Sequence, residues 1–233
     1  MKPRNPQKGF TLIEIAIVLV IIGLLLGGIL KGQELITSAR VRNLIQQQDG
    51  IKAAFFGFQD RYRGLPGDYA GATTNIQGAT TNGNGDGVIK SSGTGGSAVT
   101  EPFLVWEHLS KSGFINGNYM YNATAGDLVI PKNPYGQYIG LAYDNIYAVA
   151  TGATAADRHS LKTGSQIPVE IVAEVDRKTD DGNGISGSFL FSVFTQGGIA
   201  PDAPGAAPAC ISATGVWNLT GQTNVNCGAA SFM

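Results

Sequence analysis

Two short stretches of the chain carry oxygen-bearing side chains at a spacing that suits a hard cation. In the first, Asn82, Asn84 and Asp86 alternate with glycines, as ligands do at the beginning of an EF-hand calcium loop. The position of the closing glutamate of such a loop holds Gly93. A calcium site here therefore needs another carboxylate, such as Glu101, or backbone carbonyls.

The second stretch, DRKTDDGNG, places Asp176, Asp180, Asp181 and Asn183 in a tight turn. These side chains offer the carboxylate and amide oxygens that calcium prefers. A turn of glycine, asparagine and aspartate needs no metal, however, since these residues favour turns by themselves. Calcium binding and a metal-free turn stay open as interpretations of both stretches.

Catalytic chemistry has little support in the sequence. The chain has two histidines, His108 and His159. His108 lies beside Trp106 in a segment with helical periodicity, which favours a structural role, and His159 lies in a polar stretch. Neither histidine has a neighbouring serine or cysteine arrangement of the kind that nucleophilic catalysis uses. We therefore expect a protein that is not an enzyme.

Cys210 and Cys227 are the two cysteines of the chain. In an exported protein, an even pair that closes a short loop is typical of a disulfide, which would stabilise the fold by roughly 3 kcal/mol. Two free thiols are the alternative for a cytosolic protein. A pair of cysteines does not by itself make a zinc site.

The composition favours a loop-rich head over a highly solvated cytosolic enzyme. Of the 233 residues, 14% are charged, against about 25% in typical proteins, and 33 are glycine. The length suits one substantial domain, or one domain with an appendage. The net charge of −1 gives no electrostatic sign of nucleic-acid binding, so nucleic acid is not an expected partner.

A basic N-terminus precedes a run from Phe10 to Leu30 in which Glu14 is the only charged residue. Such a run is long enough to span a bilayer as a helix, with the basic end in the cytoplasm. An ordinary signal peptide would end in an A-x-A-like cleavage site, which the sequence after the run lacks. A plain membrane anchor fits the length but gives no role to Glu14, whose charge is costly in a membrane.

The residues G-F-T-L-I-E at 9–14 resemble the class III signal of type IV pilins and pseudopilins. The basic leader and the long apolar run agree with that signal. In this family, a prepilin peptidase cuts on the cytoplasmic side after the glycine, and the new terminal residue is methylated. The resemblance implies cleavage between Gly9 and Phe10, methylation of Phe10, and a retained apolar run with Glu14 at the fifth mature position.

Electrostatics gives Glu14 a role under this interpretation. Cleavage creates a positive amine at Phe10, and a buried carboxylate and a buried amine offset much of each other's lost hydration. In a fibre of staggered helices, Glu14 of one subunit can meet the Phe10 amine of its neighbour. Other registers would leave both charges unpaired. We therefore expect Glu14 to be an assembly residue.

An amphipathic helix is predicted to follow the apolar run and to end before the turn signal at Leu65 and Pro66. Its predicted core face carries residues at steps of three and four, namely Val41, Leu44, Gln48, Ile51, Phe55, Phe58 and Tyr62. The chain thus divides into a cleaved leader (1–9), a transmembrane and fibre-core helix (10–31), the amphipathic half of the same helix (32–64), and a globular head with a C-terminal disulfide loop (65–233).

The head has the pattern of an α+β domain. A short helix is predicted over 102–113, and a second over 167–178, where the pattern also allows a strand. Strands are predicted over 137–152, 188–198 and 215–221. These elements predict an α+β fold with a long helix and a mainly antiparallel sheet, and the resemblance implies the type IV pilin-like fold, in which that helix packs on the sheet.

Four head segments also resemble a subgroup of minor pilin-like proteins, in the order RYRGLPGDY, NGNGDGVI, FLVWEHLSKSGFINGNY and DRKTDDGNGISGSF. Some pseudopilins bind structural calcium in a head loop, and this resemblance adds to the calcium prediction.

The resemblance implies a structural subunit of a type IV pilus or of a type II secretion pseudopilus. Its expected partners are prepilin peptidase, other pilin subunits, the inner membrane and the assembly machinery. It implies one membrane pass with the N-terminus in the cytoplasm and the head in the periplasm, and later a fibre at the cell surface or across the periplasm. Two alternatives stay open: a major pilin that forms the fibre alone, and an anchored periplasmic binding protein or enzyme that does not polymerise.

Overall fold

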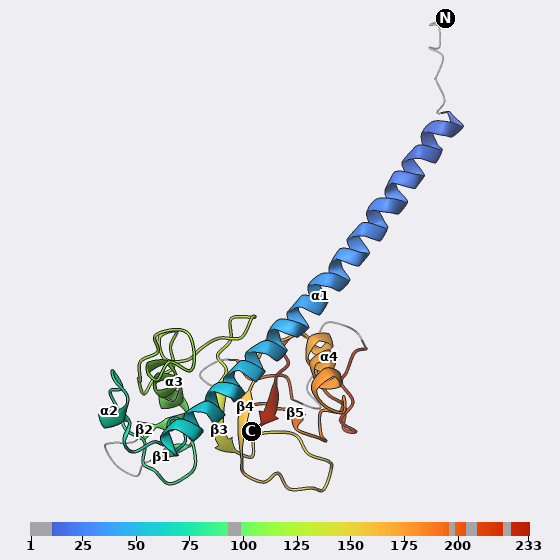
Figure 1. The fold of residues 1–233 in the computed structure, drawn as a ribbon. Coiled ribbons are helices and arrows are strands. Elements are labelled where there is room, and N and C mark those ends of the chain that lie inside the picture. Colours follow the sequence, from blue (N-terminus) through green and yellow to red (C-terminus); the bar gives the residue numbers. More distant parts are fainter. Residues whose placement is uncertain (1–10, 93–98, 196–198, 204–208, 221–224) are drawn as a thin grey trace, which may run out of the picture. The chain divides into compact units, whose positions relative to one another are not determined.

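The computed structural model describes residues 11–92, 99–195, 199–203, 209–220 and 225–233 (Figure 1). It contains the helices α1 (Leu12–Tyr62), α2 (Ala72–Asn75), α3 (Glu101–Lys111) and α4 (Val169–Thr179). Its strands are β1 (Ser91–Ser92), β2 (Val99–Thr100), β3 (Gly140–Asp144), β4 (Arg158–Lys162), β5 (Phe189–Phe191) and β6 (Ala229–Phe232). Helix α1 thus runs through both predicted halves of the N-terminal segment without a break.

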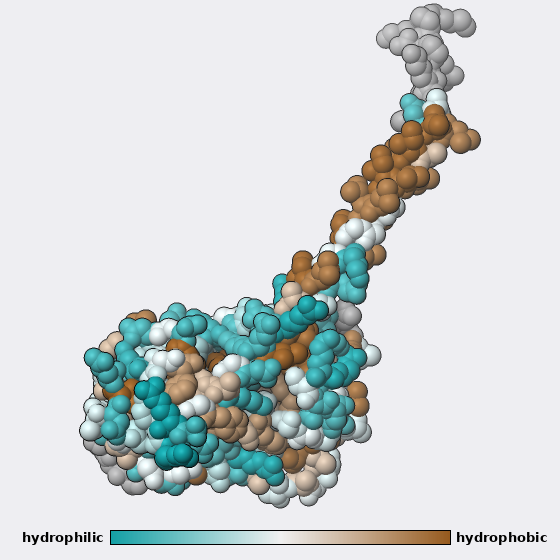
Figure 2. All heavy atoms as spheres, in the orientation of Figure 1, coloured by the Kyte–Doolittle hydropathy of each residue, from teal (hydrophilic) through white to brown (hydrophobic). Residues whose placement is uncertain are grey.

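The chain forms two compact units, residues 1–39 and 40–233. In the described part of the first unit, the apolar side chains of α1 are almost all exposed, for example Leu12 at 88% and Leu24 at 73%. Figure 2 shows a largely hydrophobic surface along the beginning of this helix, followed by a stretch where hydrophilic residues interrupt it. Among the described residues, α1 is the one helix that is long and apolar enough to cross a membrane.

The second unit contains a four-stranded antiparallel sheet with the order β3-β4-β6-β5. Its register pairs Gly140 with Lys162 and Ser160 with Phe232. The last strand in the sequence, β6, lies between β4 and β5, so the C-terminus is held inside the sheet. Strands β1 and β2 form a separate antiparallel pair beside α3.

The C-terminal half of α1 supplies one side of two hydrophobic cores. Val41 and Leu44 pack with α4, β5 and the disulfide, while Ile51 and Phe58 pack with α3, β3 and β4. Helices α3 and α4 accordingly lie on opposite sides of this half of α1 (Figure 1). The stripe predicted from steps of three and four is confirmed as the buried face of the helix from Val41 to Phe58, and its last residue, Tyr62, is half-buried.

The α+β fold class is confirmed, and so are the predicted helices, which are α3 and α4 in the structure. The strand predicted over 215–221 is wrong, because the described part of this segment forms one isolated bridge, between Trp217 and Ile211. The reason is a tight turn at Gly215, whose positive φ of 82° folds the chain back so that Val216 and Ser212 exchange hydrogen bonds. His159, placed by the sequence in a polar stretch, lies in β4.

Candidate functional site

The first candidate site is the beginning of α1, where Thr11 and Glu14 form a reciprocal cap. The backbone N–H and the hydroxyl of Thr11 donate to Oε2 of Glu14 at 2.7 and 2.8 Å, and the N–H of Glu14 donates to the Thr11 hydroxyl at 3.3 Å. This is the capping box, T-x-x-E, which satisfies backbone donors that the first helical turn leaves free. The predicted processing residues Gly9 and Phe10 lie outside the described residues.

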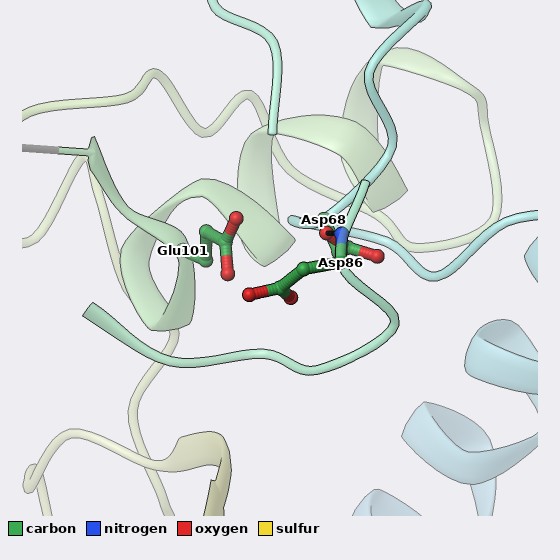
Figure 3. A group of neighbouring side chains, drawn as sticks. All are labelled: Asp68, Asp86 and Glu101. Carbon is green, nitrogen blue, oxygen red and sulfur yellow. Dashed lines mark hydrogen bonds between the residues drawn. The ribbon is translucent and has the colours of Figure 1, made fainter. Parts of the chain in front are cut away.

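A second candidate site brings Asp68, Asp86 and Glu101 together (Figure 3). One carboxylate oxygen from each lies within 4.8 Å of the others. Asp68 follows the turn after α1, Asp86 lies in the loop before β1, and Glu101 begins α3. Three segments that are distant in the sequence therefore converge on one acidic cluster.

Backbone amides already occupy the two buried carboxylates of this cluster. Asp68 accepts the N–H groups of Asp86 and Gly87 at 2.9 and 3.0 Å. Glu101 accepts the N–H groups of Asn84 and Lys90 at 3.1 and 3.2 Å. The two side chains thus clamp the loop 84–90 from both sides through its backbone.

The predicted ligands of the first stretch are only partly assembled. Asp86 joins the cluster, and Glu101 supplies the additional carboxylate that the sequence required. Asn82 instead accepts the N–H of Thr73 at 2.8 Å, and Asn84 caps the N–H of Asp86 at 2.8 Å. Calcium binding at this cluster stays a prediction.

The electrostatics of the cluster follows from burial and from like charge. Burial raises the pKa of the Glu101 carboxyl, and the negative charges of Asp68 and Asp86 add to the rise. The hydrogen bonds from the backbone of Asn84 and Lys90 act in the opposite direction. One cation is close, because Nζ of Lys90 lies 3.7 Å from Oδ2 of Asp86. The exposure of that pair keeps its contribution to stability small.

Helix α3 holds further loop backbone through Glu107 and His108, both fully buried. Glu107 accepts the N–H groups of Thr80 and Tyr121, each at 2.6 Å. Nδ1 of His108 accepts the N–H of Gly67 at 3.0 Å, and Nε2 lies 3.0 Å from the carbonyl oxygen of Thr81. This geometry fits a neutral imidazole with its proton on Nε2, and burial lowers the pKa of His108 accordingly.

The roles of Asp68 and Glu107 were not predicted from the sequence. The available signal was the pattern WEHL, which puts two polar residues among apolar ones on a short helix. Charged residues are rarely fully buried without partners. By that rule, a glutamate among the apolar residues of this helix is expected to have backbone or cationic partners.

A third candidate site lies at the end of α4, where Asp176, Asp180 and Asp181 place one carboxylate oxygen each within 4.8 Å of the others. Oδ2 of Asp180 accepts the N–H groups of Ser188 and Phe189 at the beginning of β5. The exposed Asp181 accepts the N–H of Asn183 at 2.9 Å and the hydroxyl of Ser186 at 2.5 Å. Oδ1 of Asn183, the fourth predicted ligand, accepts the N–H of Ile185 at 3.2 Å.

Asp176 differs from the other two because it is fully buried. Its Oδ2 accepts a hydrogen bond of 2.6 Å from Nε1 of Trp217, while its Oδ1 has no hydrogen-bond partner. Burial raises the pKa of Asp176 to about 6, against the lowering effect of the hydrogen bond from Trp217 and of the Gly182 backbone N–H, and the charges of Asp181 and Asp180 add to the rise.

Cys210 and Cys227 are joined by a disulfide in the structure, with their Cα atoms 5.6 Å apart. Both are buried in the core that contains α4, β5 and Trp217. The bond therefore connects the Trp217 turn to the segment that leads into β6.

The hydrogen bonds of both histidines are to backbone groups. Nε2 of His159 accepts the N–H of Ile89 at 3.2 Å, and His108 contacts Gly67 and Thr81 as described above. In the part of the chain that the structure describes, neither imidazole is hydrogen-bonded to a serine, threonine or cysteine side chain. The geometry fits structural histidines better than a catalytic base.

The comparisons with known proteins concern the first site. The model of the prokaryotic N-terminal methylation motif matches residues 4–30. No curated protein matches the chain. The matched residues contain the predicted cleavage position, the capped beginning of α1 and its exposed apolar stretch. The motif implies processing by prepilin peptidase and assembly with other pilins. Through residues 4–30, the chain thus carries the N-terminal methylation signature that type IV pilins and pseudopilins share.

Proposed function

We propose that the protein is a structural subunit of a type IV pilus or of a type II secretion pseudopilus, present as a minor component of the fibre. The observation that carries the proposal is the methylation motif at residues 4–30, on a helix that is apolar and exposed at its beginning and amphipathic from Val41 onward. One half of α1 belongs to the core of the head, and the other half needs an apolar environment from outside its own chain.

The size of that requirement follows from the exposed apolar side chains. Burying a Leu or Ile side chain contributes about 1.5–3 kcal/mol. Between Leu12 and Leu30, α1 exposes more than ten large apolar side chains, most of them more than half exposed. A bilayer satisfies this surface before assembly, and the helices of neighbouring subunits satisfy it in a fibre.

The processing and assembly steps follow from the chemistry of the first residues. Prepilin peptidase cuts between Gly9 and Phe10, and the new Phe10 amine is methylated and keeps its positive charge. In the fibre, Glu14 meets the Phe10 amine of a neighbouring subunit and sets the axial register. Before assembly, the head lies in the periplasm and the N-terminus in the cytoplasm, in agreement with the basic leader.

The test is the intact mass and the N-terminal sequence of the protein, recovered separately from sheared surface fibres and from membranes. We expect a chain that begins at methylated Phe10, with low abundance in the fibre fraction for a minor subunit. High abundance in fibres would favour the major pilin instead. A chain that still begins at Met1, or one cut after the apolar run, would remove the pilin function and favour an anchored or secreted periplasmic protein.

A further inference from the structure

The chain contains Asn-Gly pairs at residues 82–83, 84–85, 116–117 and 183–184. We propose that Asn116, in the loop that follows α3, is a site of spontaneous deamidation, where the side-chain amide is lost through a cyclic imide formed with Gly117. This modification goes beyond the proposed fibre function and does not depend on it. The chemistry needs a free glycine N–H and a free asparagine side chain, and the pairs differ in both respects.

The reaction is an intramolecular attack on an amide. The backbone nitrogen of Gly117, after losing its proton to water or hydroxide, attacks Cγ of Asn116 and closes a succinimide ring. The bond from Cγ to the side-chain nitrogen breaks, and that nitrogen leaves as ammonia. Water then adds to one of the two ring carbonyls and opens the ring, which leaves aspartate or isoaspartate at position 116. The net change is hydrolysis of one amide by water, without an oxidant or a reductant.

In the other pairs, the glycine N–H is already hydrogen-bonded to a backbone carbonyl. Gly83 donates to Tyr69 at 3.1 Å, Gly85 donates to Asp68 at 2.9 Å, and Gly184 donates to Gly215 at 2.9 Å. A nitrogen held in this way must give up its hydrogen bond before it can attack. These pairs therefore react only when the surrounding loop opens.

The asparagine side chains of these same pairs are also held. Oδ1 of Asn82 accepts the N–H of Thr73 at 2.8 Å, Oδ1 of Asn84 accepts the N–H of Asp86 at 2.8 Å, and Oδ1 of Asn183 accepts the N–H of Ile185 at 3.2 Å. Each bond fixes the position of the carboxamide that the glycine nitrogen has to reach.

Asn116 and Gly117 are free of such bonds. Both are exposed, and in the part of the chain that the structure describes, neither the Asn116 side chain nor the Gly117 N–H has a hydrogen-bond partner. The loop is anchored on either side of the pair instead, where the N–H groups of Phe114 and Tyr119 donate to residues of α3 at 3.0 and 3.3 Å. The segment between these anchors leaves both reacting groups available.

The backbone of this loop also favours glycine at position 117. Gly117 has a φ of 114°, and a Cβ at this position would lie 2.8 Å from Cε2 of Tyr119. Because glycine has no Cβ, its nitrogen is less shielded than that of any other residue. The conformation of the loop thus calls for the residue type that makes the reaction fastest.

The reaction would place a new negative charge on a cavity. Asn116 lines a cavity of about 510 Å³ between α1 and the loop after α3, and Lys132 lines the same cavity. Among the described residues that line it, none is acidic. Lys132 is paired with Asp127 at 2.7 Å, outside this lining. Deamidation therefore gives the cavity its first carboxylate.

The experiment incubates the full chain in detergent at neutral to mildly alkaline pH and follows every Asn-Gly pair by mass spectrometry of peptides. Digestion at acidic pH, where ring closure is slow, prevents the reaction during sample preparation. In the folded protein, we expect Asn116 to deamidate at least about ten-fold faster than the other asparagines of these pairs, which wait for a local opening. In urea the rates should converge, because the pairs then share the same local sequence.

Asn116→Gln is the matched variant, since glutamine keeps an exposed amide but has to close a larger ring, so position 116 should stay unchanged. The proposal is overturned if Asn116 stays intact in the folded protein over a period in which it reacts in urea. It is also overturned if Asn82, Asn84 or Asn183 reacts as fast as Asn116 in the folded protein. A product that contains aspartate without isoaspartate would overturn it as well, because that result indicates direct hydrolysis and not ring closure.

Discussion

Oε2 of Glu14 accepts hydrogen bonds from both the backbone N–H and the hydroxyl of Thr11, at 2.7 and 2.8 Å. The side chain that the sequence assigns to an intersubunit charge pair therefore also caps its own helix. The two roles need different properties of residue 14, because capping needs only an acceptor, whereas the pair with the Phe10 amine needs a negative charge. Substitutions at Glu14 and Thr11 can therefore separate the capping role from the charge-pair role.

We predict that Glu14→Gln is processed and inserted but assembles poorly, with the yield of sheared fibres reduced more than about ten-fold. The reason is that glutamine keeps an acceptor for Thr11 but leaves the amine of the neighbouring subunit unpaired in an apolar core, at a cost of about 3–5 kcal/mol. Immunoblots of membrane and sheared fractions measure both steps.

Glu14→Ala and Thr11→Ala are the matched controls for this experiment. Alanine at 14 removes the charge and the cap, so it should assemble no better than glutamine. Alanine at 11 removes the capping hydroxyl, costs about 1 kcal/mol of helix stability and should keep most of the fibre yield. A normal yield from Glu14→Gln would show that the acceptor alone is sufficient and would refute the charge pair.

A second prediction concerns the clamp on the loop 84–90. Asp68→Ala should lower the free energy of unfolding by about 2–4 kcal/mol, because the N–H groups of Asp86 and Gly87 lose their acceptor. Urea unfolding of the full chain in detergent measures the change. Asp157→Ala removes an exposed carboxylate and should stay within about 0.5 kcal/mol of the unmodified chain. An equally small effect for Asp68→Ala would mean that the loop is not held by this side chain.

A third prediction concerns pH and His108. Burial lowers the pKa of His108 in the folded state, while in the unfolded state its pKa is about 6.5. Below that value the unfolded chain binds a proton that the folded chain does not, so stability is lost as the pH falls. The loss is at most about 1.4 kcal/mol per pH unit, until the folded-state pKa is reached.

His108→Gln isolates this contribution, since glutamine can still accept from Gly67 and donate to Thr81 but does not titrate. Unfolding free energies from pH 5 to 8 should fall less steeply toward acid for the variant than for the unmodified chain. His159, whose pKa burial also lowers, is present in both proteins and cancels in the difference. Parallel pH profiles would mean that His108 is protonated equally in the two states.

The sequence predicts the parts of this fold that depend on local periodicity. The stripe from Val41 to Phe58 and helix α3 follow from apolar spacing, whereas the spacing over α4 is compatible with a helix or a strand. The sequence T-L-I-E also contains the spacing of the capping box. The strands β4 and β6 were not predicted. β4 reads RHSLK, with little strand character, and it is a strand because β3 and β6 pair with it on both sides.

For the acidic clusters, the sequence predicts only that acidic residues lie in turns, and not which segments those residues contact. Nothing local to NGNGDGVI indicates that its backbone is held by Asp68, which precedes Asp86 by many residues, or that Asn82 turns away to Thr73. Likewise, the side-chain hydrogen bond that Asp176 accepts comes from Trp217, in a turn near the C-terminus. Contacts of this kind arise from tertiary packing between distant segments, which local sequence patterns do not predict.

The final prediction concerns the disulfide and the turn that it holds. Cys210 and Cys227, separated by 17 residues, enclose the Trp217 turn, whose indole supplies the hydrogen bond to Asp176. Replacing both cysteines by serine should lower the free energy of unfolding by roughly 3 kcal/mol, because the unfolded chain regains the entropy of that loop. The measurement is urea unfolding of the double variant and of the unmodified chain, each with and without reductant. The reductant should destabilise only the unmodified chain and should bring it close to the variant. If the unmodified chain is as stable with reductant as without it, the bond is either not formed in the isolated protein or contributes nothing to its stability.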